Sequence, residues 1–169
     1  IVLVGGGIHS SYSLDLFREF IQLIKIPVVN SLMAVDALSY YDPLRVGFIG
    51  SYGNRWANIT LSNSDFVLVL GSRLDVRQTG SQVKEFKGNK TIYHVDCEKG
   101  EINNRISGCV VVNSTLQSFL TSIIKYIGKK EFQTRKDWID EINYLKNLFP
   151  DYKENSKISG INPNNFMHK

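Results

Sequence analysis

The segment Gly71–Gly80 carries the residues of this sequence that are best suited to bind an anion. It reads Gly-Ser-Arg-Leu-Asp-Val-Arg-Gln-Thr-Gly and directly follows the apolar run Phe66–Leu70. The guanidinium groups of Arg73 and Arg77 can donate paired hydrogen bonds to phosphate or carboxylate oxygens. Asp75 suits either an ion pair with one arginine or a ligand hydroxyl, and ordinary surface ion pairs are the alternative. Because ligands bind beyond the carboxyl ends of strands in open α/β sheets, the segment predicts a phosphate-binding loop.

Two further glycine clusters are expected at the same edge of the sheet. Gly5, Gly6 and Gly7 follow the first apolar run, and Gly47 and Gly50 bound a second turn. Glycine lets the backbone approach a flat or anionic ligand closely, and the helix after the first cluster can offer its N-terminus to a phosphate. Tight turns without a ligand explain these glycines equally well.

A standard NAD-type fingerprint is not predicted. Ser10 stands where G-x-G-x-x-G needs its last glycine, and Asn30 stands where the acidic residue is expected. Asp96 closes the predicted strand Thr91–Val95 and suits ribose hydroxyls, which donate hydrogen bonds to a carboxylate. Capping of a short helix after Asp96 is an equal alternative. His94 alternates with apolar neighbours and is interpreted as a core histidine.

The sequence predicts no catalytic residue and no metal ligand in this chain. It has no nucleophile–base pair, no G-x-S-x-G elbow and no histidine or cysteine spacing typical of a metal site. Cys97 and Cys109 lie beside apolar strand-like residues and are interpreted as buried free thiols of a reducing compartment. The cytoplasm is therefore the expected location.

Length and composition narrow the class of protein. A chain of 169 residues fits one domain, and 43 % apolar with 21 % charged residues is ordinary for a globular protein. The net charge of +4 is small, and the basic and acidic residues of the tail alternate instead of forming a basic patch. Nucleic acid is therefore not an expected partner. No apolar run reaches the roughly 18 residues that span a bilayer, so no membrane partner is expected. The start Ile1-Val2-Leu3-Val4 is typical of a strand interior, which predicts an excised piece of a longer protein.

Short apolar runs alternate with longer amphipathic segments, which is typical of βαβ units around a parallel sheet. The expected strands are Ile1–Val4, Val28–Asn30, Phe66–Leu70, Thr91–Val95 and Cys109–Val112. The expected helices cover Leu14–Ile24, Asn54–Asn63, Val83–Phe86, Leu116–Ile127 and Thr134–Phe149. Ser114 and Gln117 predict a capping box for the fourth helix, and residues 31–52 show no clear pattern. We expect an α/β, Rossmann-like three-layer domain with a mostly parallel sheet of about six strands and helices on both faces.

Together, these motifs resemble the central domain of thiamine-diphosphate-dependent enzymes of the acetolactate synthase family. The similarity covers about Ile1–Leu120, in order and with sensible spacing. Its motifs are the glycine triplet, Pro27-Val28, Gly47–Gly50, Ala57-Asn58, Asp65, Gly71–Gly80, Ile92–Asp96 and Glu101-Ile102.

The resemblance implies a domain over residues 1–150 and a linker over 151–169 toward an absent diphosphate-binding domain. Thiamine diphosphate and Mg²⁺ would be bound by flanking domains that are missing here, so the fragment alone would be inactive. The parent enzyme would be a homodimer or homotetramer that decarboxylates a 2-keto acid such as pyruvate and transfers the two-carbon unit to an acceptor.

The central domain of this family holds the ADP part of FAD, or ADP or CoA, or nothing. By resemblance, the glycine turns, Arg73, Asp75, Arg77 and Asp96 line that pocket. A structural domain with an empty pocket and a decarboxylase acting on another 2-keto acid remain open. An NAD-dependent deacylase is disfavoured because zinc-binding cysteines are missing.

The sequence departs from the family pattern at two places. Met33–Asp36 stands where the family often has glycine and lysine, and Asn113 stands where it usually has aspartate. An aspartate there would favour hydrogen-bond donors on the ligand, so its loss weakens the expectation of FAD specifically.

Overall fold

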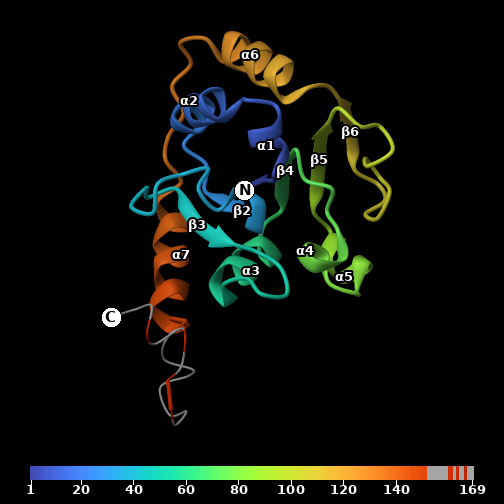
Figure 1. Ribbon diagram of the computed structural model, residues 1–169. Helices are drawn as coiled ribbons and strands as arrows, with labels where there is room; N and C mark the ends of the chain where they lie inside the picture. Colours follow the sequence, from blue (N-terminus) through green and yellow to red (C-terminus); the bar gives the residue numbers. More distant parts are fainter. Residues whose placement is uncertain (152–159, 162, 164–165, 167–169) are drawn as a thin grey trace.

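The computed structural model describes residues 1–151, 160, 161, 163 and 166. Within this part, six parallel strands form one sheet in the order β3-β2-β1-β4-β5-β6 (Figure 1). The strands are β1 (Val2–Val4), β2 (Val28–Asn30), β3 (Arg45–Phe48), β4 (Phe66–Leu70), β5 (Thr91–Asp96) and β6 (Val110–Asn113). The predicted Rossmann-like sheet is confirmed. Most of the predicted linker lies outside the described residues.

Helices cover both faces of the sheet. They are α1 (Gly7–Ser10), α2 (Leu14–Ile24), α3 (Arg55–Ser62), α4 (Val76–Thr79), α5 (Val83–Lys87), α6 (Leu116–Ile127), α7 (Lys136–Leu148) and the 3₁₀ turn η1 (Leu32–Ala34). The predictions of α2, α3, α5, α6 and α7 are confirmed to within a few residues at each end. None of the helices in the described part of the chain has the length and apolar character needed to cross a bilayer.

Two apolar layers hold the helices on the sheet. Figure 1 shows α2 beside α6, and α3 beside α7. Along β1, Val2 and Val4 pack with α2 and α6, whereas Leu3 packs with α3 and α7 on the opposite face. This alternation follows from the two-residue repeat of a strand, and it explains why the whole of β1 is buried.

Strand β3 lies in the segment for which no strand was predicted. Gly47 interrupts its apolar pattern, and the pairing with β2 shifts between Val28 and Val29 to accommodate an extra residue. A Cβ at Gly47 would overlap Asn54 Oδ1, which accepts a hydrogen bond from the Phe48 amide. Gly47 therefore belongs to a strand and not to the predicted turn, and its side-chain position is filled by Asn54.

The predicted capping box of α6 is wrong by one residue. Thr115 is the N-cap, and its hydroxyl oxygen accepts a hydrogen bond of 3.2 Å from the Ser118 amide. The Ser114 amide instead donates to the Asp96 carbonyl at the end of β5. Because Ser114 still belongs to the hydrogen-bonding pattern of the sheet, the helix begins one residue later than predicted.

The prediction of two buried thiols is half wrong. Cys109 is buried just before β6, but Cys97 is exposed. Cys97 directly follows Asp96, the last residue of β5, and lies in a bend beyond the strand.

Candidate functional site

The predicted site segments meet at the carboxyl edge of the sheet. The Gly5 amide donates to Leu70 of β4, and the Ser31 amide donates to Val4 of β1, both at 2.9 Å. The Gly71 amide likewise donates to Val95 of β5 at 3.0 Å. The first residue after each of these strands is thus bonded to the end of its neighbour. The strand order reverses between β1 and β4, which is the switch point where open α/β sheets receive ligands.

The glycines at the switch point pack against one another. A Cβ at Gly7 would lie 2.8 Å from Gly71 Cα, and a Cβ at Gly5 would overlap the Gly71 carbonyl oxygen. The Gly7 amide donates to that carbonyl oxygen at 3.0 Å. Gly6 faces the side chain of Met33 instead. The close contact between these loops is therefore enough to require glycine at positions 5, 7 and 71, whether or not a ligand binds.

The arginine segment contains a short helix that the sequence interpretation placed in a loop. Asp75 is the N-cap of α4, and its Oδ1 accepts hydrogen bonds from the amides of Arg77 at 2.8 Å and Gln78 at 3.2 Å. Asp75 caps α4 because the four residues of this helix are too few to satisfy their own amides, and its predicted use for an arginine or a ligand hydroxyl stays a prediction. Arg73 lies 3.8 Å from Glu101 Oε1, and the side chains of Arg73 and Arg77 are both exposed.

Asp96 and Asn113 hold the ends of β5 and β6 together. The Asp96 Oδ1 atom accepts a 2.9 Å hydrogen bond from the Glu98 amide, in a turn and not at the start of a helix. Asn113 Nδ2 donates at 3.0 Å to the carbonyl oxygens of Asp96 and Cys97. An aspartate at position 113 would direct its carboxylate at two carbonyl oxygens, so asparagine suits this arrangement.

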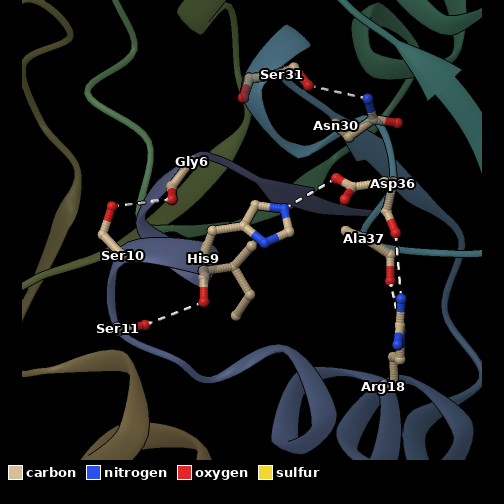
Figure 2. Close-up of polar contacts among 10 residues, drawn as sticks. Gly6, His9, Ser10, Ser11, Arg18, Asn30, Ser31, Asp36 and Ala37 are labelled. Carbon is tan, nitrogen blue, oxygen red and sulfur yellow. Dashed lines mark hydrogen bonds and ion pairs between the residues drawn. The ribbon is translucent and has the colours of Figure 1, made fainter.

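Ser31 is a candidate site residue that was not predicted from the sequence. It directly follows β2, its side chain is almost wholly buried, and its hydroxyl oxygen has no hydrogen-bond partner among the described residues. The Asn30 side chain next to it donates to the Ser31 carbonyl oxygen at 3.0 Å (Figure 2). Two polar residues after the apolar run Pro27–Val29 were the signal that could have indicated this position.

A second missed feature joins the loops that follow β1 and β2. His9 Nε2 lies 2.9 Å from Asp36 Oδ1, and Arg18 donates to the backbone carbonyls of Asp36 and Ala37 (Figure 2). Asp36 is one of the residues at which the chain departs from the family pattern. The residue that stands at this departure, Asp36, thus has a partner within the domain, His9 of the short helix α1.

His94 is a core residue, as predicted. Its side chain is 1 % exposed on β5. Burial lowers the pKa of His94, although the backbone hydrogen bond to Ser72 and the nearby carboxylates of Asp96 and Glu101 act in the opposite direction. Burial in the sheet therefore favours the neutral imidazole.

The sequence matches the family described as "Thiamine pyrophosphate enzyme, central domain" over residues 1–123. The chain belongs to this family. It is 32 % identical over 155 residues to the probable acetolactate synthase large subunit of Methanococcus aeolicus, covering 86 % of this chain and 26 % of that protein. It is 32 % identical over 154 residues to the acetolactate synthase large subunit of Cyanidium caldarium, covering 89 % and 26 %. It is 33 % identical over 154 residues to acetolactate synthase 2, chloroplastic, of Zea mays, covering 89 % and 24 %.

The chain thus spans about a quarter of the length of these relatives. The resemblance drawn from the motifs is confirmed at the level of the family. The matched residues include every strand and every residue of the carboxyl edge described above.

Proposed function

We propose that this chain binds an adenine nucleotide, as ADP or as the ADP part of FAD, across the carboxyl edge of its sheet. The observation that carries the proposal is the Ser31 hydroxyl, which is buried beside the switch point without a partner in the part of the chain that the structure describes. A buried polar group without a partner costs about 1–3 kcal/mol, and a ligand oxygen or nitrogen within reach would remove that cost.

Each predicted site residue has a distinct role in this proposal. The exposed guanidinium groups of Arg73 and Arg77 bind the diphosphate, and Asp75 holds the backbone of Arg77. The second carboxylate oxygen of Asp96 accepts a hydrogen bond from a ribose hydroxyl. The glycines Gly5, Gly6, Gly7, Gly50 and Gly71 shape the loops and let the ligand lie close to the backbone, whereas Gly47 leaves room within β3 for the Asn54 side chain.

We further propose that the whole protein is an acetolactate-synthase-like transferase that decarboxylates a 2-keto acid and passes the two-carbon unit to an acceptor. Thiamine diphosphate supplies the carbanion chemistry of such enzymes. The described residues contain no group of three His, Cys, Asp or Glu side chains that could hold a metal ion. From the family resemblance we propose that flanking domains bind thiamine diphosphate and Mg²⁺, and that this chain contributes nucleotide binding or domain packing.

Calorimetric titration of the full-length protein with ADP, FAD and CoA tests the nucleotide site. We expect ADP or FAD to bind, and the Arg77→Gln variant to bind at least about tenfold more weakly, since a hydrogen bond to a charged group contributes about 1.5–3 kcal/mol. A visible absorption spectrum of the purified protein identifies bound flavin. Binding of equal strength in both proteins would contradict the role of Arg77.

A scaffold with an empty pocket is the second candidate, and a specific observation favours it. The loops at the switch point are in direct backbone contact at Gly5, Gly7 and Gly71, so the space between these residues is already occupied. Absence of heat with all three ligands, together with normal enzyme activity, would establish the scaffold. An assay of pyruvate and other 2-keto acids then separates a synthase from a decarboxylase with another substrate.

The assembly and location of the whole protein are also proposals. We propose a homodimer or homotetramer in the cytoplasm, although relatives described as chloroplastic occur in Zea mays. Light scattering of the full-length protein measures the number of subunits.

A further inference from the structure

The side chain of Asn58 bonds both polar groups of the Gly50 backbone. The Gly50 amide donates to Asn58 Oδ1 at 2.9 Å, and Asn58 Nδ2 donates to the Gly50 carbonyl oxygen at 3.1 Å. This reciprocal pair needs one donor and one acceptor on the same side chain, so it defines the orientation of the amide. Asn58 comes from the middle of α3 and is half-buried.

The Gly50 turn in turn packs on the backbone of Arg77. The Ser51 amide donates to the Arg77 carbonyl oxygen at 2.8 Å. Gly50 has a φ of +105°, and a Cβ at this position would overlap the same carbonyl oxygen. The close contact therefore exists only because Gly50 lacks a side chain and is held in this conformation.

The backbone of Arg77 is consequently held from two sides. Its amide donates to Asp75 Oδ1 within α4, and its carbonyl oxygen accepts from Ser51 across the edge of the sheet. Its side chain is exposed and free to meet a ligand. The turn also borders an open hollow of about 430 Å³ lined by Gly50, Asn58 and Gln78. Water in that hollow would compete for the Gly50 backbone if Asn58 were removed.

We propose that Asn58 is a positioning residue for phosphate recognition, because it holds the Gly50 turn against Arg77 and so directs the guanidinium group toward the nucleotide. This inference rests on the proposed function. It extends that function to a residue of α3 whose side-chain amide bonds the Gly50 backbone. A role in positioning predicts that loss of Asn58 weakens binding of phosphate-bearing ligands and leaves adenosine binding unchanged.

The test uses the full-length protein with Asn58→Ala and Asn58→Asp. Asn58→Asp keeps the shape and the acceptor and remains informative if Asn58→Ala does not fold. Asn63→Ala is the matched control, because it removes the same amide from an exposed position at the end of α3. Hydrogen exchange is measured at the Gly50 and Ser51 amides without nucleotide, and the affinities for ADP and adenosine are measured with and without Arg77→Gln.

We expect Asn58→Ala to accelerate exchange at both amides and to weaken ADP binding about tenfold, close to the loss of one hydrogen bond to a charged group. Asn58→Asp keeps the acceptor for the Gly50 amide but loses the donor to the Gly50 carbonyl oxygen, so exchange should accelerate mainly at Ser51. The Asn58→Ala change should cause no further loss of ADP affinity in the Arg77→Gln protein. The positioning role alone would be overturned if the Gly50 and Ser51 amides stayed protected in both Asn58 variants. It would also be overturned if Asn58→Ala lowered the ADP affinity equally with and without Arg77. Absence of ADP binding by the unchanged protein would overturn the proposed function and this role with it.

Discussion

The imidazole Nε2 atom of His94 lies 2.8 Å from the backbone carbonyl oxygen of Ser72. Both residues are almost wholly buried, and the contact joins the centre of β5 to the loop that follows β4. Because Nδ1 is buried and no described residue bonds to it, the neutral ring that donates from Nε2 is the form that fits this site.

The first prediction concerns pH. Burial lowers the pKa of His94 in the folded chain below its usual value of 6.5, so the unfolded chain binds more protons as the solution is acidified. The contribution of His94 to stability is therefore complete above pH 6.5 and is lost progressively at lower pH. His94→Gln keeps a donor for Ser72 but does not titrate. Urea unfolding at several pH values should show a shallower loss of stability in this variant, and equal slopes would contradict the prediction.

The second prediction concerns the loop contact at the switch point. A Cβ at Gly5 would lie 2.5 Å from the Ser72 Cβ, which is too close for real atoms. Gly5→Ala should lower the free energy of unfolding by about 1–3 kcal/mol, the usual cost of overpacking. Gly100→Ala is the control, since its nearest neighbour would be Glu98 Oε1 at 3.5 Å. It should change stability by less than about 0.5 kcal/mol in chemical denaturation.

The third prediction concerns the start of α6. Thr115→Ala removes the hydroxyl that caps the Ser118 amide and should lower the unfolding free energy by about 1 kcal/mol. Ser114→Ala, one residue earlier, removes an exposed hydroxyl and should cost less than about 0.5 kcal/mol. A larger loss of unfolding free energy in the Ser114→Ala variant than in Thr115→Ala would support the capping box predicted from the sequence.

The fourth prediction separates ligand binding from stability. Ser31→Ala removes a buried hydroxyl that has no partner among residues 1–151, so the ligand-free protein should become more stable by about 1 kcal/mol, the lower end of the cost of such a group. The same change should weaken ADP binding in calorimetry. Ser13→Ala is the comparison, because that buried hydroxyl donates to the Ser11 carbonyl oxygen at 3.1 Å and its loss should destabilise the chain. A less stable Ser31→Ala protein would show that the hydroxyl is used within the fold.

Much of the fold could be predicted from the sequence because its signals are local. The apolar run of β4 and the helical stripe of α2 are long enough for their periodicity to be unambiguous. The rule that parallel strands end at one edge then brings Arg73, Asp96 and the first glycine cluster together. Applying this rule requires only the order of strands and helices along the chain, and no knowledge of side-chain contacts.

The rest depends on contacts between distant segments. Strand β3 forms although Gly47 interrupts it, because β2 and Asn54 provide partners that no local pattern shows. The short helix α4 has too few residues for periodicity, and its cap by Asp75 appears only once the loop is folded. The burial of Ser31 likewise depends on the surrounding fold and not on its own neighbours in sequence.

The contact between Gly7 and Gly71 limits how the sequence of this domain can evolve. In an ordinary core, a larger residue can be accommodated when its neighbour becomes smaller, so paired positions exchange volume. Here a side chain at Gly7 would meet the backbone of Gly71, and glycine has no smaller replacement. Neither position can compensate for the other. We therefore expect the two positions to stay glycine together among relatives that keep this loop contact, and to show no covariation.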